Sequence, residues 1–191
     1  QYYALRDTLE RNKTDVTEEE ITLINPEIKV KAYREGITPE NLDDFLKDCD
    51  YVHDVMDYYH PNLKLEFHRR SREKGLIVTM AFICGTGASV LSFHPERMSF
   101  DEYFEVPKHL EGWDLNPNKI MGKSSDYIDS EYFMGRVKQG NVPTSCDGAY
   151  LTGIIAAGIY KRLLMGKEVA YVPEMIRIDV VDDLLYKKLL I

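Results

Sequence analysis

The stretch YVHDVMDYYHP, residues 51–61, decides how the rest of the chain is interpreted. Its alternating apolar residues over 51–56 predict a strand, and Pro61 predicts the first turn of a helix that follows. In open α/β sheets, ligands bind in the crevice beyond the carboxyl ends of the strands. Asp57 therefore stands where a carboxylate can reach a metal ion or a polyphosphate.

Helical and strand patterns alternate on both sides of this stretch. A helix is expected over residues 4–25, interrupted near 12–15 and restarting at Thr17, with a strand over 28–33 after it. The other expected elements are helices over 38–46, 61–74 and 145–166, and strands over 76–83, 88–93 and 171–181. This order predicts an α/β, Rossmann-like three-layer domain over residues 1–191. Its sheet should be mostly parallel with antiparallel C-terminal strands.

The segment at about 94–143 does not follow this alternation. It combines turn signals with an aromatic and acidic cluster at residues 100–105, and it contains one possible helix over 125–137. Long excursions of this kind are usually functional or mobile. The aromatic cluster can either cover the core or form a docking surface.

Composition excludes several classes of protein. The 32 acidic and 24 basic residues give a net charge of −8, which argues against a nucleic-acid-binding surface. The basic run at residues 68–74 is typical of a solvated C-terminal end of a helix. Three widely spaced cysteines suit a reducing cytoplasm and argue against a structural zinc, and no apolar run is long enough to span a membrane.

Several short motifs resemble one family when they are taken in order. They are YYALRD at 2–7 followed by Asn12 and Lys13, INPEIKV at 24–30, DVMD at 54–57, GTG at 85–87, the Gly- and Ala-rich helix at 151–166, and Ile178-Asp179. Together they span almost the whole chain. The sequence resembles the ThiF/MoeB/HesA family of ubiquitin-activating-enzyme-like adenylyltransferases.

The resemblance implies ATP-dependent adenylation of a carboxylate, such as the C-terminus of a small β-grasp carrier protein or a small-molecule acid. Lys13 would neutralise phosphate charge, and Asp57 would hold Mg²⁺ on the phosphates, with Asp54 in a supporting role. Gln1 and Tyr58 would lie near the nucleotide. The family also implies a homodimer that forms on the side of the closing helix.

The sequence departs from the family pattern at several points. The Gly-rich loop of the family is expected before Gln1, so the domain is interpreted as N-terminally incomplete. Tyr58 stands where the family often has Asn, and Asn62 where it often has Arg or Lys. Two alternatives therefore stay open: a non-catalytic domain that binds a partner or completes another subunit, and a nicotinamide- or flavin-binding oxidoreductase. Cys146, at a helix start, is either a small structural residue or a thiol that takes the activated product.

Overall fold

The structure is a computed structural model, and it describes residues 5–57, 60–111, 113–121, 131, 135–136, 139 and 144–181. The chain forms two compact units, residues 1–45 and 46–191. Each unit is described by itself below. The expectation of a single domain over the whole chain stays a prediction.

The first unit contains the 3-10 helix η1 (Arg6–Thr8) and the helices α1 (Lys13–Ile24) and α2 (Leu42–Phe45). The predicted helix restart at Thr17 was wrong by about one turn. The side chain of Asn12 accepts a hydrogen bond from the backbone N–H of Thr14 at 2.9 Å, so Asn12 is the N-cap and α1 begins at Lys13.

The strand expected over residues 28–33 is not formed. This segment is held by side chains instead, because Lys31 Nζ and Tyr33 Oη both donate to Asp44 Oδ2 at 2.7 Å. Period-two alternation predicts which residues share a face, but a strand also needs a neighbouring backbone to pair with.

Among the described residues, the second unit is built on a four-stranded sheet with the order β1-β2-β3-β4. The strands are β1 (Tyr51–Asp54), β2 (Ile77–Cys84), β3 (Gly87–Phe93) and β4 (Ile176–Asp179). Strands β1 and β2 are parallel, whereas the β2–β3 and β3–β4 pairs are antiparallel. The Rossmann-like α/β class and the antiparallel late strands are confirmed, but the parallel majority is not found among the described strands.

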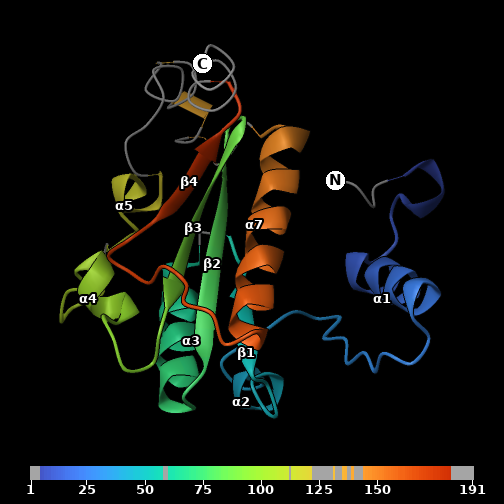
Figure 1. The fold of residues 1–191 in the computed structure, drawn as a ribbon, viewed down its shortest axis with the longest axis horizontal. Helices are drawn as coiled ribbons and strands as arrows, with labels where there is room; N and C mark the ends of the chain where they lie inside the picture. The colour runs from blue at the N-terminus through green and yellow to red at the C-terminus, as the bar shows by residue number, and fades with distance from the viewer. Residues whose placement is uncertain are drawn as a thin grey trace. The chain divides into compact units, whose positions relative to one another are not determined.

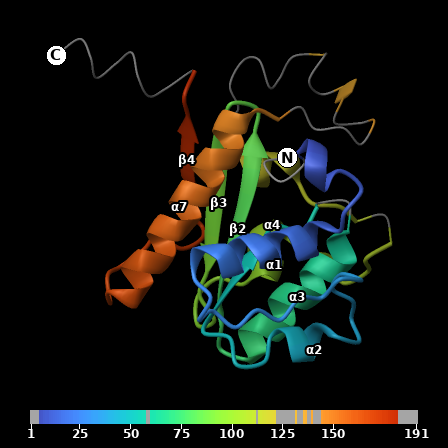
Figure 2. The ribbon, with the colours of Figure 1, turned by 90° about the vertical axis from the view of Figure 1, so that its right-hand side faces the viewer.

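Helices cover both faces of this sheet, so the second unit has three layers (Figures 1 and 2). Helix α7 (Cys146–Leu164) packs on one face, and α3 (Pro61–Glu73) packs on the other as the crossover between β1 and β2. One core cluster joins Ala81 of β2 and Val90 of β3 to Ile159 of α7. Every residue of β3 is buried, as expected for a central strand covered on both faces.

The predicted bounds of the two long helices are confirmed within two residues. Pro61 occupies the first turn of α3, and Gly75 adopts a φ of +73° just after its end. Ser145 caps α7 by accepting from Gly148 N at 3.3 Å. Local capping signals therefore set both helices.

In the described part of the excursion, two short helices are formed, α4 (Phe100–Phe104) and α5 (Pro117–Met121). Phe100 and Phe104 are each only 3% exposed, so the aromatic cluster covers the core. Arg69 of α3 binds Asp101 of α4 at 2.5 Å. The predicted helix over 125–137 lies mostly outside the described residues. Among the helices that are described, none combines the length and hydropathy needed to span a bilayer.

Candidate active site

A pocket of about 220 Å³ lies at the carboxyl ends of β1 and β2. It is bounded by the segment after β1, the second half of β2, and α7 with the residue that leads into it. Its lining residues are Val55, Met56, Asp57, Ala81, Phe82, Ile83, Thr144 and Thr152. The pocket therefore occupies the crevice in which open α/β sheets bind ligands.

Asp57 is an exposed acid at this pocket, three residues beyond the end of β1. The N-cap residue of the following helix α3 is His60 rather than Asp57. Thr144 and Thr152 add hydroxyl groups to a lining that is otherwise largely apolar. A solvent-accessible carboxylate at the edge of an apolar hollow suits a ligand that carries cations on one end and an apolar ring on the other.

The beginning of α7 is fixed against the β2–β3 turn. Both the backbone N–H and the hydroxyl of Ser145 donate to the carbonyl oxygen of Gly85, at 3.2 and 3.0 Å. A Cβ added to Gly148 would lie 2.6 Å from Ile83 Cγ2 and 2.7 Å from the carbonyl oxygen of Gly87. Glycine at position 148 therefore lets the first turn of α7 approach the sheet closely beside the pocket.

The glycine of α7 that lets the helix backbone approach the sheet is Gly148 in the first turn, and not the glycines in the middle of the helix. A Cβ added to Gly153 or Gly158 would meet nothing within 4 Å among the described residues. Cys146 is exposed in the first turn of α7 and is not part of the pocket lining.

A buried charged cluster lies directly behind Asp57. The Asp54 carboxylate, at the end of β1, receives Lys64 Nζ at 2.7 Å on each of its oxygens and lies 3.0 Å from His68 Nε2. The side chains of Asp54 and Lys64 are 0% exposed, and that of His68 is 2% exposed. We call these three residues the Asp54 cluster.

Burial and charge act in opposite directions on this cluster. Burial raises the pKa of Asp54, but the hydrogen bond from His68 and the attraction of Lys64 together lower that pKa below its usual value. Burial lowers the pKa of Lys64 and of His68, and Asp54 opposes both shifts. The arrangement is that of an ionised Asp54–Lys64 pair with a neutral imidazole that donates its Nε2–H to Asp54.

The predicted site residues fall in different parts of the chain. Asp57 lies in the second unit at the pocket, and Lys13 is an exposed residue in the first turn of α1 in the first unit. Gln1 and Tyr58 lie outside the described residues. The roles of these residues toward a nucleotide stay predictions.

Sequence reasoning missed Lys64 and His68. The run at 68–74 was expected to be a solvated helix end, but His68 and Ser71 are buried. Lys64, His68 and Ser71 follow at i, i+4 and i+7, which places them on one helical face. That spacing can be seen in the sequence, but a helix face that carries mixed polar residues usually faces solvent.

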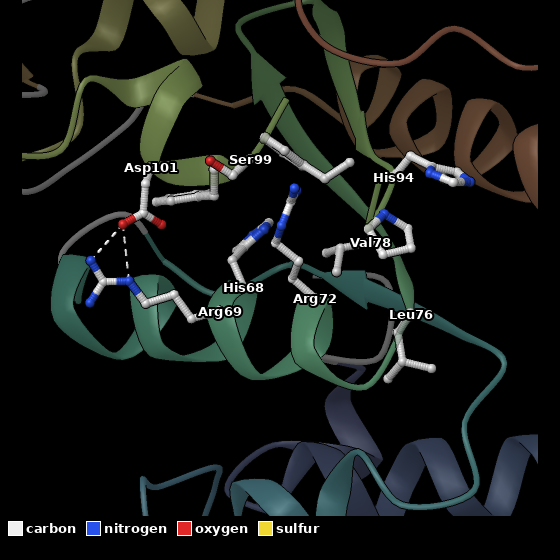
Figure 3. A pocket seen from close by; sticks show the side chains of 11 residues that line it. His68, Arg69, Arg72, Leu76, Val78, His94, Ser99 and Asp101 are labelled. Carbon is white, nitrogen blue, oxygen red and sulfur yellow. Dashed lines mark hydrogen bonds and ion pairs between the residues drawn. The ribbon is translucent and has the colours of Figure 1, made fainter. Parts of the chain in front are cut away.

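A much smaller cavity, of about 30 Å³, lies on the far side of His68, between α3 and α4 (Figure 3). Its wall includes Val78, Phe93 and Phe100, and the Arg69–Asp101 pair lies at its edge. The space suffices for about one water molecule. This cavity is too small for a substrate. The 220 Å³ pocket is the candidate site because it lies beyond the carboxyl ends of β1 and β2, whereas a larger hollow of about 920 Å³ is lined mainly by residues 94–97 and 166–171 and does not include Asp57.

Mg²⁺ would have to bind here with few protein ligands. Among the described residues, no group of three or more His, Cys, Asp or Glu side chains could hold a metal ion. Mg²⁺ is commonly bound by one or two carboxylates and takes its remaining ligands from water and substrate phosphates. The exposed carboxylate of Asp57 fits that mode of binding.

Comparison with known proteins places these features in a family. The model of the ThiF family matches residues 1–188. Among solved structures, a crystal structure of selenomethionine PaaA has a TM-score of 0.59 and 14% sequence identity, with 93% of this chain and 47% of the PaaA chain covered. At that identity the likeness shows the fold, and the chain spans about half the length of PaaA. No curated protein matches the chain.

Proposed function

Because the chain belongs to the ThiF family, we propose that it contributes to an adenylation site that activates a carboxylate with ATP. Adenylyltransferase-like activity is general in this family. The observation that carries the proposal is the exposed Asp57 at the 220 Å³ pocket beyond the carboxyl ends of β1 and β2. The substrate would be the C-terminus of a small β-grasp carrier protein or a small carboxylic acid.

The reaction is a displacement at phosphorus. An oxygen of the substrate carboxylate attacks the α-phosphorus of ATP, the bond to the bridging oxygen breaks, and pyrophosphate leaves from an acyl adenylate. Bound Mg²⁺ would neutralise phosphate charge. Asp57 would hold that ion, while the apolar walls formed by Ala81, Phe82 and Ile83 exclude water from the acyl adenylate.

The role that we propose for Lys13 is to neutralise phosphate charge. Lys13 is exposed in the first turn of α1 and can present its ammonium group to an anion. A cation that meets the charge developed on the leaving pyrophosphate stabilises the transition state more than the ground state.

ATP–pyrophosphate exchange in the full-length protein tests this function. Asp57→Asn should lower the exchange rate by about 100-fold or more, the usual effect of removing one electrostatic stabiliser. Because Asp57 is exposed, the stability should change by no more than about 0.5 kcal/mol. Asp50→Asn is the matched control, since Asp50 is also exposed but precedes the opposite end of β1.

The same experiment separates the alternatives. ATP binding without exchange in the wild-type protein would favour a non-catalytic domain that binds a partner. Binding of a nicotinamide or flavin in place of ATP would favour an oxidoreductase. Wild-type exchange that Asp57→Asn leaves unchanged would refute the role given to Asp57.

We further propose a homodimer that forms through α7. Its outer face exposes Tyr150, Ile154 and Leu164, which are 56%, 67% and 74% exposed, and Gly153 on this face leaves open space. Ile154→Glu should convert the dimer to a monomer in light scattering, whereas Lys47→Glu, at an exposed position outside α7, should leave the dimer intact. A wild-type monomer at micromolar concentration would refute this proposal.

A further inference from the structure

Asp54 lies three residues before Asp57, and a hydrogen bond links Asp54 to the segment between them. The backbone N–H of Met56 donates to Asp54 Oδ1 at 2.9 Å. This bond closes a tight Asx-type turn directly after β1. The direction in which Asp57 leaves the strand therefore depends on where Asp54 holds its oxygens.

Asp54 has little freedom to move. Lys64 binds both carboxylate oxygens, so rotation of the carboxylate would break at least one contact of 2.7 Å. His68 approaches Oδ2, the oxygen that does not bind Met56. The three contacts therefore leave Oδ1 pointing at the segment that carries Asp57.

The third member of the cluster is itself held by packing. The ring of His68 lies 4.2 Å from that of Phe100 and 4.9 Å from that of Phe93, measured between centroids. Phe100 belongs to α4, so the excursion encloses this face of α3. Lys64 Nζ also lies 5.5 Å from the centroid of the Phe82 ring, and Phe82 lines the pocket.

We propose that Lys64 and His68 are positioning residues, which hold Asp54 so that its Oδ1 fixes residues 55–57 and aims the Asp57 carboxylate into the pocket. The proposal rests on the function proposed above. A buried ion pair between a strand and a helix is an energetically costly way to stabilise a fold, since apolar residues of similar size often do as well. A role in positioning gives this costly arrangement a reason.

Two double variants test the proposal and differ only at position 54. Asp54→Leu/Lys64→Met removes both charges and the acceptor for Met56 N–H. Asp54→Asn/Lys64→Met removes both charges but keeps a side-chain oxygen that can accept from Met56. Both avoid an unpaired buried charge, so both should fold. Leu65→Ala is the control for general loosening, because Leu65 is buried on α3 beside the cluster.

The first measurement is amide hydrogen exchange over residues 55–57 in the nucleotide-free, full-length protein. The Leu/Met variant should exchange about tenfold faster than wild type, the effect of one lost hydrogen bond of ordinary net strength. The Asn/Met variant should exchange at an intermediate rate, about threefold faster than wild type, because it keeps an acceptor for Met56 N–H but loses the Lys64 contacts that hold this acceptor in place. Wild-type protection in the Asn/Met variant would overturn the role given to Lys64. Equal protection of the segment in wild type and both double variants would overturn the proposal, as would equal loosening by Leu65→Ala.

The second measurement is the Mg²⁺ concentration at half-maximal ATP binding. This concentration should rise about tenfold in the Leu/Met variant, because an Asp57 carboxylate that is no longer held in position binds Mg²⁺ less well. The affinity for ATP without Mg²⁺ should stay unchanged. Faster exchange with an unaltered Mg²⁺ midpoint would overturn the positioning role. Absence of ATP binding in the wild-type protein would instead refute the proposed function, and the exchange measurement would still decide whether Asp54 anchors the segment.

Discussion

Replacement of Lys64 by methionine should be among the most destabilising single changes in the second unit. The change removes the ammonium group and keeps a side chain of similar length. Asp54 would then be a buried carboxylate whose remaining partners, among the residues that the structure describes, are His68 and Met56 N–H. The structure offers it no route to solvent, because its side chain is 0% exposed.

The magnitude follows from the loss of two charge-assisted contacts of 2.7 Å in a buried site. Removing one partner of such a pair lowers the free energy of unfolding by about 3–5 kcal/mol, whereas replacing both partners by apolar groups is often close to neutral. Lys64→Met should therefore lose about 3–5 kcal/mol. Asp54→Leu/Lys64→Met should recover at least about half of that loss. Total stabilities of 5–15 kcal/mol make this difference easy to measure.

Urea denaturation followed by far-ultraviolet circular dichroism gives both values. Arg69→Met is the matched control on the same helix, since its partner Asp101 is partly exposed and such pairs contribute about 0–1 kcal/mol. A loss below about 1 kcal/mol for Lys64→Met would refute the reasoning, because Asp54 would then have found other partners or solvent. A double variant less stable than the single variant would refute it as well.

Three further predictions follow from the same structure. Gly148→Ala should lower the free energy of unfolding by about 1–3 kcal/mol, because the new Cβ meets backbone and side-chain atoms within 3 Å. Gly153→Ala should raise the free energy of unfolding by up to about 1 kcal/mol, because its new Cβ meets nothing within 4 Å among the described residues. Thermal unfolding of the two variants checks both values. Ser99→Ala should cost about 1 kcal/mol by removing the capping box of α4, and an unchanged melting temperature would contradict this. Burial lowers the pKa of His53 and His68, so below pH 6.5 the unfolded chain binds protons that the folded chain does not. The free energy of unfolding should therefore fall as the pH drops through 6.5, by at most about 1.4 kcal/mol per pH unit for each proton. Urea titrations from pH 8 to 5 measure this slope, and a flat profile would contradict the lowered pKa of both rings.

Residues 51–61 allowed the sequence to predict the strand, the turn and the helix that follows, and the structure confirms them as β1 and α3. The signals there are local: an alternating run, a proline in the first turn and a glycine after the last. The continuous apolar run that became β2 and the cap at Ser145 are also local. Asp57 lies at the pocket because it follows the carboxyl end of β1, and a sequence that predicts the strand also predicts where the strand ends.

Interactions between distant segments decided the rest. Residues 28–33 had the alternation of a strand but no strand to pair with, and that depends on the fold. Lys64 and His68 looked like part of a solvated helix because polarity is their only local property. They are buried because α3 lies against the end of β1, where Asp54 supplies the opposite charge, and because α4 closes over His68. The sequence by itself determined where an acid would stand, and only the tertiary structure decided what holds it in place, since burial and charge pairing arise between segments that the chain alone does not bring together.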